Sequence, residues 1–126
     1  MLLKSGGGSM VYHARNGHQQ FNVEVLDCDR RLDASAMVRL KQRMNQFVKK
    51  NHTRVLIDMS RTQQVDLAGL GLLIERLRML RTLNGDIKLC NLRRQVSDML
   101  RLVGVSRLME AYDSREEALR SFCCLQ

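Results

Sequence analysis

The stretch that decides the fold is Val65-Asp66-Leu67-Ala68-Gly69-Leu70-Gly71-Leu72-Leu73, which is apolar except for one acid and two glycines. A second short apolar run, residues 54–59, is separated from it by five mostly polar residues. This order predicts a buried strand, a tight loop and a helix. Asp66 is the expected N-cap of that helix, because its carboxylate can accept hydrogen bonds from the free amides of the first turn.

The two glycines of this stretch need their own explanation. Gly69 and Gly71 each lower helix stability by about 1 kcal/mol relative to alanine. Either the helix packs closely on the sheet at these positions, or a partner molecule approaches the backbone there. Close packing is the more common reason, and the spacing alone leaves both explanations open.

The composition is that of one globular domain. The chain has 126 residues, of which 44% are hydrophobic and 27% are charged, and this length supports one core. No apolar run approaches the roughly 20 residues that span a bilayer, and the start lacks the hydrophobic stretch of a signal peptide, so we expect a cytoplasmic protein. Residues 1–9 contain the run SGGGS and are expected to be a tag or linker remnant, which leaves residues 10–126 as the domain.

The net charge of +8 permits an acidic partner without requiring one. The basic residues are dispersed over the expected helices, and two tyrosines and three phenylalanines are too few for a base-stacking platform. We therefore expect no nucleic-acid binding. The four cysteines form no C-x-x-C pattern and have no histidine at metal-ligand spacing, so we expect no metal site and no cofactor.

Hydrophobic periodicity predicts the remaining elements. Residues 21–26 alternate as in a strand with one wet face, and residues 10–13 are the expected hairpin partner. Further strands are expected at residues 55–57, 87–90 and, at an edge, 108–112. Helices are expected after Asp33 or Ser35, after Asp66, over residues 95–103 and after Ser114, which begins a capping box. The prediction is an α/β fold with a mixed sheet of four to five strands and about four helices.

Four segments in order resemble the STAS domain of the anti-sigma-factor antagonists. Residues 31–35 (RLDAS) resemble the family's G-x-L-D-A-x-T, and residues 55–60 (VLIDMS) resemble its V-x-L-D-L-S strand. Residues 66–71 (DLAGLG) stand where the family has D-S-S-G-L-G, and residues 116–119 (EEAL) resemble its last helix, E-x-A-L. The resemblance covers about residues 21–122, and it implies a single STAS-like domain.

The resemblance also implies a function. Family members of this type bind a histidine-kinase-like anti-sigma factor that is also a serine kinase. Phosphorylation of the first serine of D-S-S-G breaks the complex, and a phosphatase restores it. The physical basis is that a phosphate brings about −1.5 to −2 charges into a docking surface, where it is costly to desolvate. In this chain the switch position is Leu67 and the second serine is replaced by Ala68, so neither can be phosphorylated.

We therefore expect a non-catalytic regulatory protein, a monomer or weak dimer, that binds such a kinase-like anti-sigma factor. Ser60 and Thr62 remain as hydroxyls on the preceding loop, although such residues are more often plain turn residues. The partner-binding residues expected from the resemblance and from the exposed face of the helix are Asp33, Ser60, Thr62, Asp66, Leu67, Ala68, Gly69, Gly71, Leu72, Glu75, Arg76 and Met79.

Two other functions are weighed against this one. STAS-like proteins without the serine also resemble accessory subunits of transporters, in which they bind a transport ATPase, and the basic charge suits a place beside acidic membrane or protein surfaces. An enzyme is the third class, because Asp33, Asp58 and Asp66 lie at strand ends, where α/β active sites occur. However, the chain has no phosphate-binding glycine loop and no nucleophile–base pair.

Overall fold

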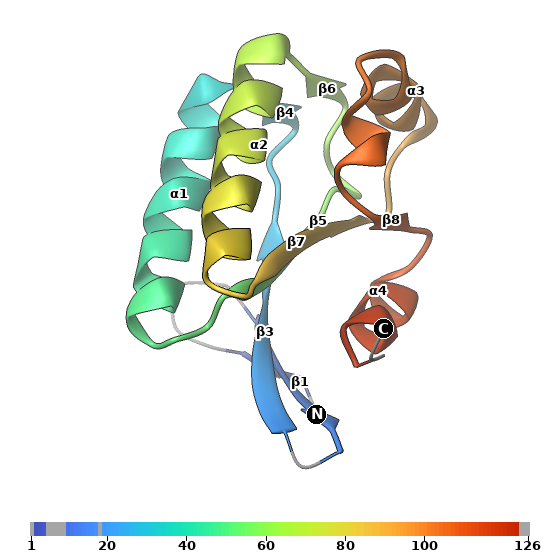
Figure 1. Cartoon of the computed structure of the whole chain (residues 1–126). Helices are drawn as coiled ribbons and strands as arrows, with labels where there is room; N and C mark the ends of the chain where they lie inside the picture. Colours follow the sequence, from blue (N-terminus) through green and yellow to red (C-terminus); the bar gives the residue numbers. More distant parts are fainter. Residues whose placement is uncertain (1, 5–9, 18, 124–126) are drawn as a thin grey trace.

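The structure is a computed structural model that describes residues 2–4, 10–17 and 19–123, and its architecture is the predicted α/β fold (Figure 1). In the described part of the chain the main sheet has six strands in the order β1-β2-β3-β5-β7-β8. The first three pair antiparallel and the others pair parallel. The strands are β1 (Leu2–Lys4), β2 (Met10–Asn16), β3 (Gln19–Asp27), β5 (Arg54–Asp58), β7 (Asp86–Cys90) and β8 (Ala111–Tyr112).

Within the described residues, four α-helices cover this sheet (Figure 1). α1 (Ala34–Lys49) and α2 (Leu67–Thr82) lie side by side on one face, and their apolar stripes enclose the main core with side chains of β5 and β7. α3 (Arg94–Leu102) contributes Val96 and Leu100 to the same core. α4 (Arg115–Phe122) covers the opposite face, where Ala118, Leu119 and Phe122 meet a second cluster. Alternate residues of β3, β5 and β7 thus supply the two cores.

The helices begin where their capping residues stand. Asp33 caps α1 by accepting from the Ala36 amide at 2.8 Å, which settles the choice between Asp33 and Ser35. Asp66 caps α2, and Ser114 caps α4 by accepting from the Glu117 amide at 3.1 Å. α3 differs, since its N-cap residue Arg93 makes no side-chain capping bond.

Two of the described cysteines lie in the hydrophobic core. Cys28 and Cys90 are free and buried, one in each hydrophobic cluster. Burial raises the pKa of the Cys90 thiol to about 12, so this side chain stays neutral and packs as a small apolar group. The residues from 124 onward, which include Cys124, lie outside the described residues.

Several details differ from the predictions. Leu2–Lys4 lies against β2 as β1, because the open edge of a hairpin leaves backbone groups to be paired; residues 1 and 5–9 of the expected linker lie outside the described residues. A second sheet, β4 (Arg31–Leu32) with β6 (Gln64–Val65), was not predicted. The helix expected over residues 95–103 ends at Leu102 instead, and the Val103 side chain is exposed.

Candidate functional site

The first turn of α2 carries the residue that the resemblance marks as the switch position. Asp66 accepts a hydrogen bond from the Gly69 amide at 2.7 Å, which fixes the start of the helix. The next side chain, Leu67, is 66% exposed. Ala68 beside it is also exposed. This turn therefore presents an apolar surface without a hydroxyl at either position.

The two glycines of α2 have different surroundings. A Cβ added at Gly69 would lie 2.3 Å from the carbonyl oxygen of Leu32, so only glycine lets α2 approach β4. A Cβ added at Gly71 would meet no atom within 4 Å, and Gly71 is exposed. Close packing thus explains Gly69, whereas the helix itself gives no reason for Gly71.

The loop before α2 separates the two candidate hydroxyls. Ser60 is exposed, and its backbone is held from both sides: its amide donates to Asp58 Oδ1 at 2.9 Å and its carbonyl accepts from Arg93 Nε at 3.0 Å. Thr62 is fully buried, and its hydroxyl donates to the carbonyl of Asp29 at 2.7 Å. Thr62 was expected on the partner-binding surface, but it holds the loop from inside because its hydroxyl satisfies a backbone acceptor. Of these two hydroxyls, a kinase can reach Ser60 and not the buried Thr62 in the folded protein.

Leu72 lies on the outer face of α2, as expected, and an apolar side chain of α1 lies next to it. Leu72 is 38% exposed, and Val38 of α1 beside it is 55% exposed. The side chains of Leu72, Glu75, Val38 and Lys41 border a small hollow of about 110 Å³ between the two helices. This hollow lies on the face that also carries the exposed Glu75.

Arg76 and Met79 were expected to be exposed on that face, but both are largely covered. Arg76 lines the hollow yet is only 9% exposed, and its guanidinium donates to Asn45 Oδ1 of α1 at 3.2 Å. Its long side chain is therefore used to join α1 and α2. Met79 is half-buried and packs against the main core. Asp33, also half-buried, is at the rim of the site as the cap of α1.

A buried carboxylate supports the loop from below. Asp58, at the end of β5, is 4% exposed and accepts from the Ser60 amide, from Asn91 Nδ2 at 3.2 Å and from Arg115 Nη2 at 2.8 Å. Burial alone would raise the pKa of the Asp58 carboxyl, but these hydrogen bonds outweigh it and hold the pKa below its ordinary value. Asp58 is therefore a charged anchor for the loop.

This geometry agrees with the comparison to known families, in which residues 16–118 match the model of the STAS domain. The chain belongs to the STAS domain family. A curated relative of this STAS protein is BtrV of Bordetella bronchiseptica, described as an anti-sigma factor antagonist, with 29% identity over 75 residues. The match covers 60% of this chain and 65% of BtrV, so the STAS protein spans slightly less than two thirds of that relative.

Solved structures share the fold of the STAS protein. An anti-sigma factor antagonist of Thermotoga maritima aligns with a TM-score of 0.70 at 21% identity, over 79% of this chain and 86% of its own. SpoIIAA of Bacillus in its unphosphorylated form aligns with a TM-score of 0.64 at 20% identity, over 92% and 99% of the two chains. A sulfate transporter family protein of Wolinella succinogenes aligns with a TM-score of 0.70 at 17% identity, over 79% and 83%. These identities establish the shared fold alone.

Sequence reasoning missed three residues of this site. Val38 is an apolar residue outside the buried stripe of α1. Its position in the helix pattern was therefore a sequence signal for an exposed apolar side chain. Arg93 and Arg115 reach Ser60 and Asp58 from distant parts of the chain, so no local pattern of the STAS protein indicated them.

Among the described residues, no helix is both long and apolar enough to cross a membrane.

Proposed function

We propose that this STAS protein is a non-catalytic regulator that binds an anti-sigma factor of the histidine-kinase-like type. Its docking surface consists of the exposed members of the expected set, namely Ser60, Asp66, Leu67, Ala68, Gly71, Leu72 and Glu75. Asp33 and Met79 form its half-buried margins, and Thr62, Gly69 and Arg76 hold it from behind. The antagonist relatives support the class of partner.

One observation carries this proposal: the 66% exposure of Leu67 in the first turn of α2. An apolar side chain of this size contributes roughly 1.5–3 kcal/mol when an interface buries it fully. Leu72 and Val38 extend the apolar area along α2 and α1. A partner that covers this turn therefore gains binding energy where a phosphorylated serine would oppose binding.

The proposed complex is persistent, because phosphorylation cannot release it at position 67. SpoIIAA, which shares the fold, is known in an unphosphorylated and a phosphorylated form. In this chain Ser60, on the loop before Asp66, offers an exposed hydroxyl on the docking surface. If a kinase and a phosphatase regulate the protein through this loop, they act there and not on the buried Thr62.

The same proposal places the protein in the cytoplasm, as a monomer or weak dimer, beside the anti-sigma factors that it binds. The alternative role as an accessory subunit of a transport ATPase has the support of the fold likeness to a sulfate transporter family protein. The curated relative is described as an anti-sigma factor antagonist, so the first role is the one we propose.

The test is phosphotransfer from the histidine-kinase-like anti-sigma factors of the source organism. Each is purified and incubated with ATP and either the native chain or the Leu67→Ser variant. We expect the native chain to form a stable complex and to carry no phosphate in the first turn of α2. In the Leu67→Ser variant we expect the introduced serine to be phosphorylated. Mass spectrometry locates the phosphate. Failure of every such factor to bind the native chain, together with co-purification of a transport ATPase, would contradict the proposal.

A further inference from the structure

A groove of about 680 Å³ lies next to the docking surface, between the small sheet β4–β6 and α3. Its apolar lining comes from Leu32 and Val96, which are buried, and from Val65 and Met99, which are half-buried. Its polar lining consists of exposed glutamines and arginines together with the two capping aspartates: Arg31, Asp33, Gln63, Gln64, Asp66, Arg93 and Gln95. An apolar floor with a few polar groups at its border is the usual build of a ligand-binding site.

The charged groups around the groove that can pair with a ligand are positive. The carboxylates of Asp33 and Asp66 already accept hydrogen bonds from the first turns of α1 and α2. Arg31 and Arg93 line the groove, Arg30 and Arg94 are their neighbours in the chain, and Arg61 lies two residues before Gln63 of the lining; all five are exposed. In the part of the chain that the structure describes, none of the ion pairs with a carboxylate involves these five arginines.

We propose that this groove binds an acidic, extended segment of a protein partner, with aliphatic side chains between its carboxylates. Arginine forks suit carboxylates because they can donate two parallel hydrogen bonds. The apolar floor takes the aliphatic side chains, and the exposed glutamine amides can pair with the peptide backbone. Since the groove shares Asp66 with the docking surface, the segment belongs to the same partner, and this inference rests on the proposed function.

The lining favours a peptide over a nucleic acid. Among the described residues, no aromatic side chain lines the groove, and proteins that bind single strands stack bases on aromatic rings. The half-buried Val65 and Met99 instead offer contacts to aliphatic side chains, which a nucleic acid does not carry. A protein segment thus uses both the floor and the border of the groove.

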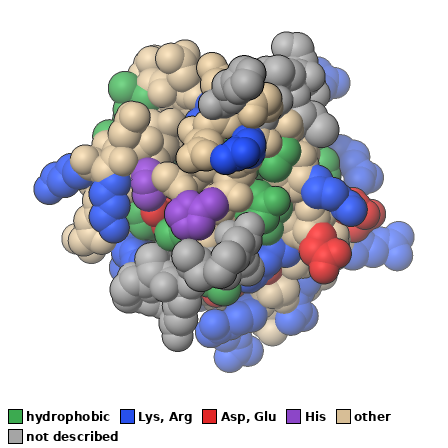
Figure 2. All heavy atoms as spheres, turned by 90° about the horizontal axis from the view of Figure 1, so that it is seen from below, with side chains coloured by type: hydrophobic (Ala, Val, Ile, Leu, Met, Phe, Trp, Pro, Cys, Tyr) green, Lys and Arg blue, Asp and Glu red, His purple; other side chains and the backbone are tan. Residues whose placement is uncertain are grey.

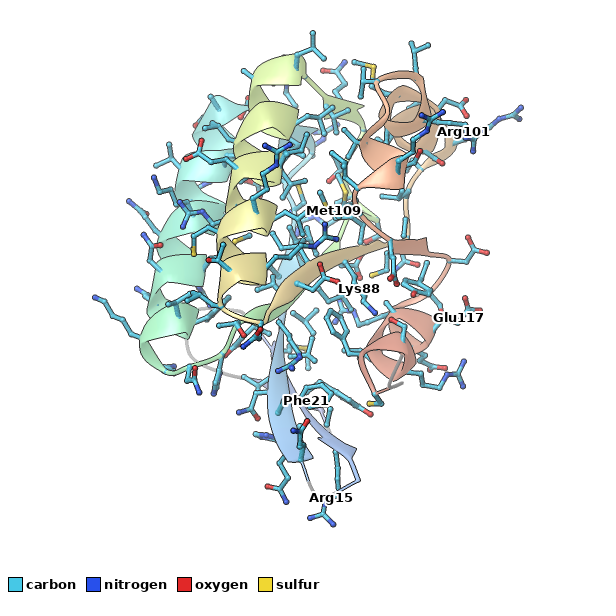
Figure 3. All side chains as sticks on the ribbon, viewed as in Figure 1. Arg15, Phe21, Lys88, Arg101, Met109 and Glu117 are labelled. Atoms are coloured by element: carbon cyan, nitrogen blue, oxygen red, sulfur yellow. The ribbon has the colours of Figure 1, made fainter. Side chains whose placement is uncertain are left out.

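The experiment measures fluorescence anisotropy of a labelled peptide that alternates glutamate and leucine, titrated with the full chain. Arg31→Glu is the main variant, because Arg31 is exposed and the substitution replaces a positive charge at the groove with a negative one. Gln95→Glu adds a second negative charge at the border and guards against a folding defect in the first variant. Arg15→Glu is the matched control, since Arg15 lies on the β2–β3 hairpin, at the opposite end of the molecule from α3, which carries Arg101 (Figure 3).

We expect Arg31→Glu to weaken peptide binding at least about tenfold, which corresponds to the loss of one charged contact. Gln95→Glu should weaken it in the same direction, and Arg15→Glu should bind as the native chain does. Equal losses in Arg31→Glu and Arg15→Glu would show a general charge effect and overturn the inference. So would native affinity in Arg31→Glu, or an oligothymidine that binds as tightly as the peptide.

Failure of this inference is distinguishable from failure of the proposed function. If the anti-sigma factor binds the native chain and Arg31→Glu equally, the docking surface is retained and the groove plays no part. If the labelled peptide binds in the expected pattern but no anti-sigma factor binds at all, the groove is retained and its partner belongs to another class of protein.

Discussion

The Nη2 atom of Arg115 lies 2.8 Å from Oδ2 of Asp58, so the first residue of α4 is ion-paired to the last residue of β5. The same guanidinium also reaches Asp27 Oδ1 at 3.2 Å, at the end of β3. Because Asp58 holds the Ser60 amide as well, one buried carboxylate connects the C-terminal helix to the loop that precedes the docking surface.

Replacing this carboxylate should change how stability depends on pH. The folded state lowers the pKa of Asp58, so its charge stabilises the fold fully above about pH 4, the ordinary aspartate value, and this contribution is lost as the pH falls below that value. Asp58→Asn should lower the free energy of unfolding by about 2 kcal/mol at neutral pH. It should also reduce the loss of stability on acidification.

Urea unfolding at about pH 7 and about pH 3 measures both effects in the native chain and the variant. Asp98→Asn is a suitable control, because Asp98 is exposed and pairs with Arg101 only at 3.9 Å, which contributes little. An unchanged acid dependence in Asp58→Asn would show that Asp58 is not the anchor described above.

The two glycines of α2 should respond oppositely to alanine. Gly69→Ala places a methyl group 2.3 Å from the Leu32 carbonyl oxygen, and we expect it to cost about 1–3 kcal/mol of stability through overpacking. Gly71→Ala meets open space and should stabilise the helix by about 0.5–1 kcal/mol. Thermal unfolding followed by circular dichroism measures both.

Gly71→Ala also tests the partner-approach explanation, because a stabilised protein that binds the anti-sigma factor more weakly would show that the partner needs the bare backbone. Stabilisation by both substitutions would contradict the close approach of α2 to β4 at Gly69.

A second buried carboxylate makes a separate prediction. The side chain of Glu24 in β3 is fully buried, and its Oε2 lies 2.7 Å from His52 Nδ1. His52 in turn contacts Asn22, which contacts His13, and histidine side chains are neighbours on the face seen in Figure 2. His52→Ala should lower the free energy of unfolding by about 3 kcal/mol, because it leaves a buried charge without its partner.

The control for this prediction is His13→Ala, at the exposed end of the same chain of contacts, which should change stability by about 0.5 kcal/mol or less. Adding Glu24→Gln to His52→Ala should restore part of the loss, since the buried charge is gone. Native stability in His52→Ala alone would show that Glu24 needs no partner.

The local features of the fold were predictable because each is encoded within a few residues. Asp66 and Ser114 were identified as caps, Asp33 was one of two candidates for the cap of α1, and each accepts a hydrogen bond from an amide of its helix. The order of strands and helices followed from hydrophobic periodicity, because residues three and four apart share a helix face and alternate residues share a strand face.

The burial of single polar residues was not predictable in this way. Arg76 lies on the polar side of the α2 pattern, yet Asn45 of the neighbouring helix accepts its hydrogen bond and draws it inward. Thr62 looked like an exposed loop residue until the carbonyl of Asp29, 33 residues away, was seen to accept from it. Both outcomes depend on contacts between distant segments, and the two-residue strands β4 and β6 pair for the same reason.

The central claim is that the first turn of α2 is the contact for the anti-sigma factor, and calorimetric titration of Leu67→Glu tests it most directly. The control is Leu83→Glu, since Leu83 is 43% exposed at the other end of α2, about 24 Å away along the helix. We predict that Leu67→Glu weakens binding about a hundredfold, equivalent to about 3 kcal/mol, while Leu83→Glu retains native affinity. Native affinity in Leu67→Glu, or an equal loss in both variants, would contradict the claim.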